Sequence, residues 1–158
     1  MNSKVVRILG IAWLVALLPF LAACGTENGS GATSSGASGT GKPGTQVQTG
    51  SGSYTNLKPS ELKTMLDSKD FFLVDTHIPP EGRLPETDLR VPFDQVDQQI
   101  AKFPSDKNAK IVLTCRSGRM SSEASQTLVG LGYTNVYNLD GGMVAWKQAG
   151  YEIIPEGK

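Results

Sequence analysis

Residues 111–121 pass from an apolar run through a cysteine and a polar turn into a helical pattern. Ile111 to Thr114 are all apolar or β-branched, which is typical of a strand buried on both faces of a parallel sheet. Ser117 and Gly118 interrupt that run. The stretch therefore predicts a strand that ends in a turn and leads directly into a helix.

The helix is expected to start at Met120. Ala124, Leu128 and Leu131 follow at intervals of three to four residues, which predicts one apolar helix face. Gly132 comes next and is a typical C-terminal stop.

Cys115 falls between the predicted strand and helix. Open α/β sheets bind ligands at the carboxyl ends of their strands, and free N–H groups at a helix N-terminus stabilise an anion such as a thiolate. Arg116 and Arg119 add two cations nearby, which are expected to attract a small anion. The alternative is a structural cysteine that packs as a small buried hydrophobe.

The rest of the predicted fold alternates strands with helices. Strands are expected at Phe71–Val74 and Asn135–Leu139, with a short edge strand at Arg90–Pro92. A first helix is expected from Pro59, with Leu62, Met65 and Leu66 on its apolar face. A second is expected at Phe93–Phe103, with Val96 and Ile100 pointing inward. A third is expected at Met143–Gln148, after a turn at Asp140–Gly142. Trp146 is expected in the core. This alternation predicts an α/β domain whose mostly parallel sheet is covered on both faces.

Asp75 ends the second buried run and should lie at the same sheet edge as Cys115. It either caps a turn or braces the cysteine loop. His77–Pro92 contains four prolines and is expected to be a loop, in which Glu81, Arg83 and Glu86 either touch substrate or face water. His77 is the only histidine, so it makes no metal site, and a loop histidine is favoured over a catalytic base.

The chain resembles the rhodanese family of single-domain sulfurtransferases. The resemblance rests on Cys-Arg-Ser-Gly at 115–118, Phe-Leu-Val-Asp-Thr at 72–76 and the closing segment 132–151, and it covers roughly residues 54–155. It implies a three-layer domain with a mostly parallel sheet of about five strands and helices on both faces.

The resemblance also implies a mechanism. The Cys115 thiolate takes sulfane sulfur from a small anionic donor such as thiosulfate, holds it as a persulfide and passes it to cyanide or a thiol, with neither metal nor organic cofactor. The loop that binds the persulfide comprises Arg116, Ser117, Gly118, Arg119 and Met120.

Two departures from the family pattern affect this expectation. The sixth loop position, often arginine in the family, is Met120, which is expected to pack inward, and the segment after Asp75 also differs. A phosphatase or arsenate reductase would need arginine at the position of Ser121. A binding module that docks an exported protein and turns over little small-molecule substrate stays open.

Residues 1–23 resemble a bacterial lipoprotein signal peptide. Lys4 and Arg7 precede sixteen uncharged residues that end in Leu-Ala-Ala before Cys24, and that run is too short for a spanning helix of roughly 20 residues. Lipidation of Cys24 would anchor the protein to the extracytoplasmic face of the cell membrane. Cys115 would then be the one free thiol.

Residues 24–53 are expected to form a flexible linker, and residues 54–158 the folded domain. Gly, Ser and Thr fill 20 of the 29 positions from Gly25 to Ser53. From Tyr54 onward 12 basic residues accompany 14 acidic ones, so the domain carries no basic stripe for nucleic acid.

Overall fold

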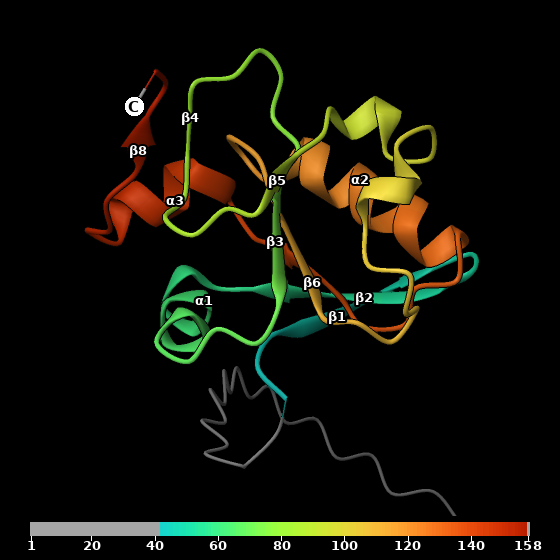
Figure 1. The fold of residues 1–158 in the computed structure, drawn as a ribbon. Coiled ribbons are helices and arrows are strands. Elements are labelled where there is room, and N and C mark those ends of the chain that lie inside the picture. The colour runs from blue at the N-terminus through green and yellow to red at the C-terminus, as the bar shows by residue number, and fades with distance from the viewer. Residues whose placement is uncertain (1–41, 158) are drawn as a thin grey trace, which may run out of the picture. The chain divides into compact units, whose positions relative to one another are not determined.

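The computed structural model describes residues 42–157, which form an α/β domain around a six-stranded sheet (Figure 1). The strand order is β1-β2-β7-β6-β3-β5. Every neighbouring pair is parallel except β1 and β2, which form an antiparallel hairpin. The α/β class and the mostly parallel sheet are therefore confirmed.

Apart from residues 45–49 and 93–103, the elements of the main sheet and its helices follow the predicted alternation. The strands of the main sheet are β1 (Thr45–Thr49), β2 (Gly52–Leu57), β3 (Phe72–Asp75), β5 (Leu89–Arg90), β6 (Ile111–Thr114) and β7 (Val136–Leu139). β4 (Gly82–Arg83) and β8 (Ile154–Pro155) form a separate antiparallel pair. The helices are α1 (Pro59–Leu66), α2 (Arg119–Gly130) and α3 (Gly142–Gln148), with two 3-10 turns, η1 (Phe93–Gln95) and η2 (Ile100–Lys102).

Helices cover both faces of the sheet. In Figure 1 α1 and α3 lie to its left, and α2 with the 3-10 turns lies to its right. Neighbouring residues of one strand belong to different cores, because side chains alternate across a sheet. Leu73 packs with Leu62 and Trp146 on the α1–α3 side, whereas Val74 packs with Leu128 on the α2 side. Trp146 is thus a core residue, as predicted.

The hairpin β1–β2 differs from the sequence prediction. Residues 45–53 were expected in the linker, but Thr45–Thr49 pairs with Gly52–Asn56 and adds a sixth strand at the sheet edge. β1 is mostly polar, and only Val47 packs against the core. The strand is held chiefly by backbone pairing, which composition does not reveal.

The segment 93–103 also differs, because two 3-10 turns replace the expected helix. The Asp97 carboxylate accepts the N–H of Gln98, and this local bond competes with a continuing α-helix. Val96 and Phe103 are nevertheless buried, and Ile100 packs against the same core. The inward positions of Val96 and Ile100 were therefore correct even though the helix was not.

At the end of α2, Leu131 is 38% exposed rather than part of the apolar face, and Val129 is buried instead. Gly132 has a positive φ of 89°, which makes it the predicted stop. The expected signal peptide, Cys24 and most of the linker lie outside the described residues. Between residues 42 and 157, no helix is long and apolar enough to cross a membrane.

Candidate active site

The cysteine loop is built at the junction of β6 and α2. β6 is buried along its whole length and places Cys115 immediately after Thr114, at the carboxyl end of the strand. Gly118 then reverses the chain with a φ of 89° and forms the N-cap of α2. Cys115 is almost completely buried, with only 1% of its surface exposed.

Two hydrogen-bond donors face the sulfur. The backbone N–H of Gly118 lies 3.1 Å from Cys115 Sγ, and the Ser121 hydroxyl lies 3.3 Å from it. The same hydroxyl lies 3.2 Å from the Gly118 carbonyl oxygen, so its one proton serves either acceptor. Both donors favour a negative sulfur over a neutral one. Gly118 was predicted to contribute to this loop, whereas Ser121 was not predicted to contact the sulfur.

The first turn of α3 holds the loop from its other side. The N–H of Met143 donates to the Cys115 carbonyl at 2.9 Å, and the N–H of Val144 donates to the Arg116 carbonyl at 3.0 Å. Gly142 makes this approach possible, since a Cβ there would lie 2.4 Å from Cys115 O. The Gly-Gly pair at 141–142 is the sequence signal for this contact, although it was interpreted only as a turn.

The two arginines of the loop are paired with carboxylates. Arg116 Nε lies 3.4 Å from Glu81 Oε2, and Arg119 Nη1 lies 2.5 Å from Glu123 Oε1. Both guanidinium side chains are more than half exposed. The charges expected to attract an anion are therefore largely offset by these neighbouring carboxylates.

The remaining predicted loop residues are less enclosed than Cys115. Ser117 is exposed, and Met120 is partly buried in the first turn of α2. Neither residue contributes one of the two hydrogen bonds to the sulfur.

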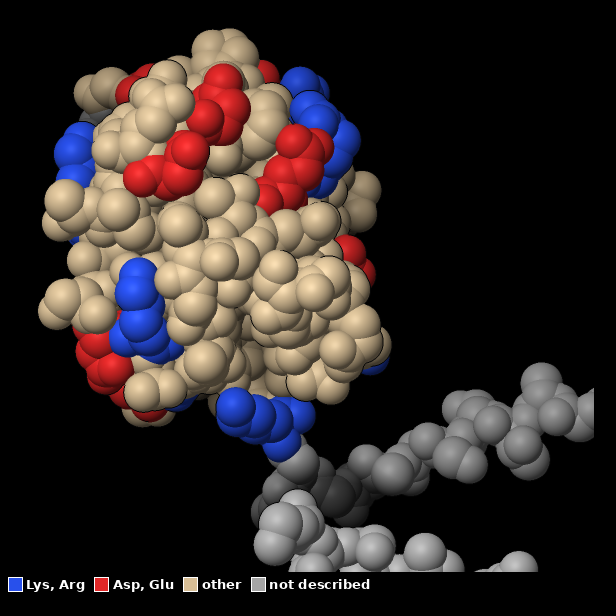
Figure 2. Space-filling model, turned by 90° about the vertical axis from the view of Figure 1, so that its right-hand side faces the viewer, with Lys and Arg blue, Asp and Glu red and all other residues tan. Residues whose placement is uncertain are grey.

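The face of the molecule in Figure 2 carries charges of both signs around a largely uncharged middle.

Asp75 lies at the expected sheet edge, where β3 pairs Asp75 with Thr114. Its carboxylate accepts the N–H of His77 at 3.1 Å and lies 3.2 Å from Arg90 Nε. Burial raises the pKa of Asp75 above its ordinary 3.8, opposed by the His77 N–H and the Arg90 charge. The carboxylate thus fixes the start of the loop after β3, while the next residue, Thr76, donates to the Thr114 carbonyl from both its N–H and its hydroxyl.

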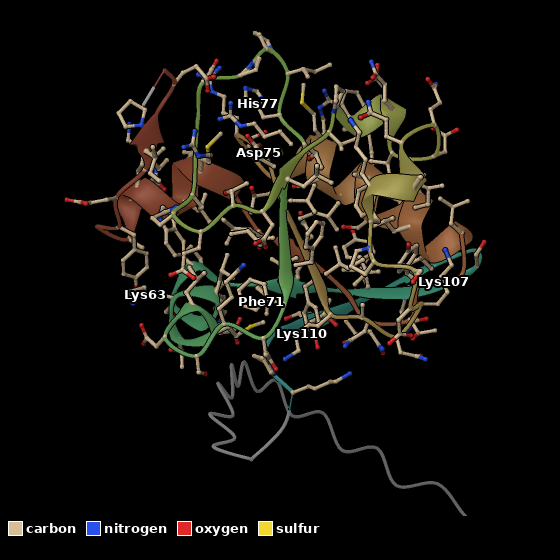
Figure 3. The ribbon with its side chains drawn as sticks, viewed as in Figure 1. Lys63, Phe71, Asp75, His77, Lys107 and Lys110 are labelled. Carbon is tan, nitrogen blue, oxygen red and sulfur yellow. The ribbon has the colours of Figure 1, made fainter. Side chains whose placement is uncertain are left out.

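His77 lies in the predicted loop but is turned inward and is only 8% exposed. Figure 3 shows His77 and Asp75 at the same end of β3, with Phe71 at the opposite end. Within the described part of the chain, neither ring nitrogen has a hydrogen-bond partner, and Nε2 lies 3.7 Å from Glu81 Oε1. The Glu81 carboxylate therefore lies between His77 and Arg116 and links the loop after β3 to the cysteine loop. Nothing in the sequence pattern indicated this contact.

Comparison with known proteins gives the same family from several directions. The family model of the rhodanese-like domain matches residues 58–149 of this sequence. A sulfurtransferase of Allochromatium vinosum is 36% identical over 97 residues, which cover 59% of this chain and 88% of that relative. The thiosulfate sulfurtransferase/rhodanese-like domain-containing protein 3 of Mus musculus is 30% identical over 111 residues, covering 61% of this chain and 69% of that relative.

A solved structure is similar as well. The crystal structure of a rhodanese-like domain protein from Staphylococcus aureus has a TM-score of 0.50 and 28% identity. The match covers 58% of this chain and 89% of the other.

Proposed function

This chain belongs to the rhodanese-like domain family, and from that premise we propose that it is a sulfurtransferase. It moves sulfane sulfur from a donor such as thiosulfate to cyanide or a thiol through a persulfide on Cys115. The observation that carries this proposal is the pair of donors, Gly118 N–H and Ser121 hydroxyl, directed at a buried sulfur. Such donors stabilise a thiolate, which is the reactive form of cysteine.

The reaction has two balanced steps. In the first, the Cys115 thiolate attacks the outer sulfur of thiosulfate, a new S–S bond forms, and sulfite leaves with the electron pair of the broken bond. In the second, cyanide or a thiolate attacks the outer sulfur of the persulfide, and the Cys115 thiolate leaves. The protein supplies the nucleophile and the hydrogen bonds that hold its charge in both steps.

The geometry supports this reaction better than phosphate ester hydrolysis. The phosphatase reaction needs an arginine that grips the oxyanion at the position of residue 121. Here that residue is Ser121, which is fully buried and bonds the sulfur. Arg119, two residues earlier, does not take its place, because its guanidinium extends to Glu123.

One observation favours a second function, a sulfur-relay module that exchanges sulfur with an exported protein and turns over small molecules slowly. Both loop arginines are already paired with carboxylates, so the site attracts small anions weakly. Persulfide formation without appreciable thiocyanate production would favour this alternative.

We further propose that the chain is a lipoprotein anchored through Cys24 on the extracytoplasmic face of the cell membrane. The basic, apolar and small-residue regions of residues 1–23 support this proposal. Expression in a bacterial host tests it, because processing would remove residues 1–23 and add lipid mass at Cys24. A Cys24→Ala chain that is still cut at that site and retained in the membrane would contradict it.

Thiosulfate-to-cyanide transfer tests the enzymatic proposal. The purified chain should produce thiocyanate, and Cys115→Ser should lose this activity while its urea unfolding midpoint stays close to that of the wild type. A serine variant with full activity would refute the role of Cys115.

A further inference from the structure

The outer edge of β1 is an unpaired edge of the main sheet. β1 is the first strand in the sheet order, and no strand among residues 42–157 pairs with its other side. The strand at the opposite edge, β5, has only two residues, whereas β1 has five. Proteins usually protect an edge strand with proline, charged side chains, a bulge or short length. β1 contains neither proline nor charge and pairs with β2 without a bulge, so it is open to a further strand.

The register of the hairpin decides which backbone groups of β1 point outward. A two-residue loop follows Thr49, so Thr49 and Gly52 are the pair that exchanges backbone hydrogen bonds at the end of the hairpin. Because this pattern alternates along the strand, Val47 also directs its N–H and C=O toward β2. Gln46 and Gln48 direct theirs away from the sheet, where a second strand can bind them.

The sequence of this edge is symmetric. Residues 44–50 read Gly-Thr-Gln-Val-Gln-Thr-Gly, which is the same in both directions. If two copies pair antiparallel about a twofold axis at Val47, Val47 faces Val47, Gln46 faces Gln48 and Thr45 faces Thr49 of the second copy. Threonine pairs are favourable cross-strand neighbours, and glutamine side chains hydrogen-bond to one another between strands. Each residue type therefore meets itself, and no like charges meet.

This register also uses the outward backbone groups fully. It places Gln46 opposite Gln48 on both sides of the axis, with each pair exchanging both of its backbone hydrogen bonds. A shift of the axis to Gln46 would need Gly44, whose N–H already donates to Glu61 Oε1 at 3.1 Å. A shift to Gln48 would need Gly50, which lies in the hairpin turn. The axis at Val47 is therefore favoured over its neighbours.

We propose that β1 is a dimerisation edge, at which two copies of this chain pair antiparallel about Val47 and join their sheets into one continuous sheet. The hairpin precedes residues 58–149, which match the family model, so this edge lies outside the matched domain. A five-residue strand pair buries less than the roughly 1,200 Å² of a stable interface, so the dimer is weak and depends on protein concentration. The proposal does not depend on the sulfurtransferase reaction.

Disulfide trapping in the full chain tests the register, in a Cys115→Ser background that removes the thiol of the active site. Facing Cα atoms of such an antiparallel pair lie about 4.5 Å apart, which a disulfide can bridge. Val47→Cys should therefore form a covalent dimer under mild oxidation. Thr45→Cys is the matched control, because its two copies would lie roughly 14 Å apart along the strands. It should stay monomeric alone but form a bridged dimer when mixed with the Thr49→Cys chain.

A second experiment leaves Val47 unchanged, because Val47 packs against the core. Gln46 and Gln48 are exposed, and replacing both with lysine places like charges opposite each other twice. This should raise the dissociation constant, measured by sedimentation equilibrium, roughly tenfold. The chain with glutamate at both positions should behave in the same way, and an equimolar mixture of the two should associate again. Lysine at Gln98 and Gln126, which are also exposed, is the control and should leave the dissociation constant unchanged.

The outcomes decide the proposal. Trapping through Val47→Cys but not through Thr45→Cys alone, together with association of the lysine and glutamate chains, supports it. Equal trapping at both positions, or in the Cys115→Ser chain that carries no new cysteine, overturns it. A mixture of lysine and glutamate chains that stays monomeric overturns the pairing of Gln46 with Gln48. A chain that is monomeric at all concentrations but binds a strand of another protein at β1 overturns the choice of a second copy.

Discussion

Gly142→Ala should disrupt the cysteine loop more than the addition of one methyl group suggests. Gly142 has a φ of 57°, and a Cβ there would lie 2.4 Å from Cys115 O and 2.7 Å from both the carbonyl carbon and the oxygen of Arg116. All three of these atoms belong to the backbone, so no side-chain rotation relieves the contact. The cysteine loop and the start of α3 must therefore separate.

The expected cost follows from two contributions. A left-handed backbone conformation costs an L-residue about 1–2 kcal/mol. Separation also lengthens the hydrogen bonds from Met143 and Val144 to the loop, each of which contributes about 0.5–1.5 kcal/mol. Together the free energy of unfolding should fall by about 2–5 kcal/mol.

Gly132→Ala is the matched control, because Gly132 has a φ of 89° but a Cβ there meets nothing within 4 Å. It should cost only the conformational part, about 1–2 kcal/mol, and leave the rate of persulfide formation unchanged. Urea unfolding and single-turnover persulfide formation measure the two effects. If Gly142→Ala costs no more than Gly132→Ala and reacts at the same rate, α3 does not hold the cysteine loop.

Two further predictions concern the sulfur and the sheet edge beside it. Ser121→Ala should slow persulfide formation roughly tenfold, because a hydrogen bond to a charged group contributes about 1.5 kcal/mol. The control variant Ser125→Ala removes a buried hydroxyl one turn further along α2 and should change the rate less than about twofold. Equal effects of the two substitutions would exclude a specific hydrogen bond from Ser121 to the thiolate. Burial raises the pKa of Asp75 in the folded protein above 3.8. The contribution of the Asp75 side chain to the free energy of unfolding is therefore fully present below pH 3.8 and is lost as the pH rises through the raised pKa of the folded state. The unfolding free energy of the wild type relative to Asp75→Asn should thus decline from acidic toward neutral pH, and a difference that grows with pH would contradict the raised pKa.

Local patterns predicted the part of the fold that surrounds Cys115. The run Ile111–Thr114 became β6, and α2 and α3 begin within one residue of their expected starts at Met120 and Met143. These elements combine a strong apolar period with a glycine turn, so each is specified by nearby residues. β1 and the 93–103 segment depend on backbone pairing and on a local side-chain bond, which the apolar pattern does not record.

The position of Cys115 between a strand and a helix was predictable from the sequence, but the surroundings of its sulfur were not. Cys115 and Gly118 were identified because a strand, a turn and a helix meet there. The contacts of Ser121 with the sulfur and of Glu81 with Arg116 depend on geometry and on a pairing across 35 residues. The ion pairs of Arg116 with Glu81 and of Arg119 with Glu123 were also not predicted, so the expected attraction of both arginines for an anion was overestimated.

The central claim is that Cys115 carries sulfur, and intact mass of the purified full chain tests it most directly. Exposure to thiosulfate or to benzenethiosulfonate should add one sulfur atom, about 32 Da, which cyanide then removes and which Cys115→Ser never gains. A chain that acquires no such mass from either donor, or a serine variant that acquires it equally, would contradict the account.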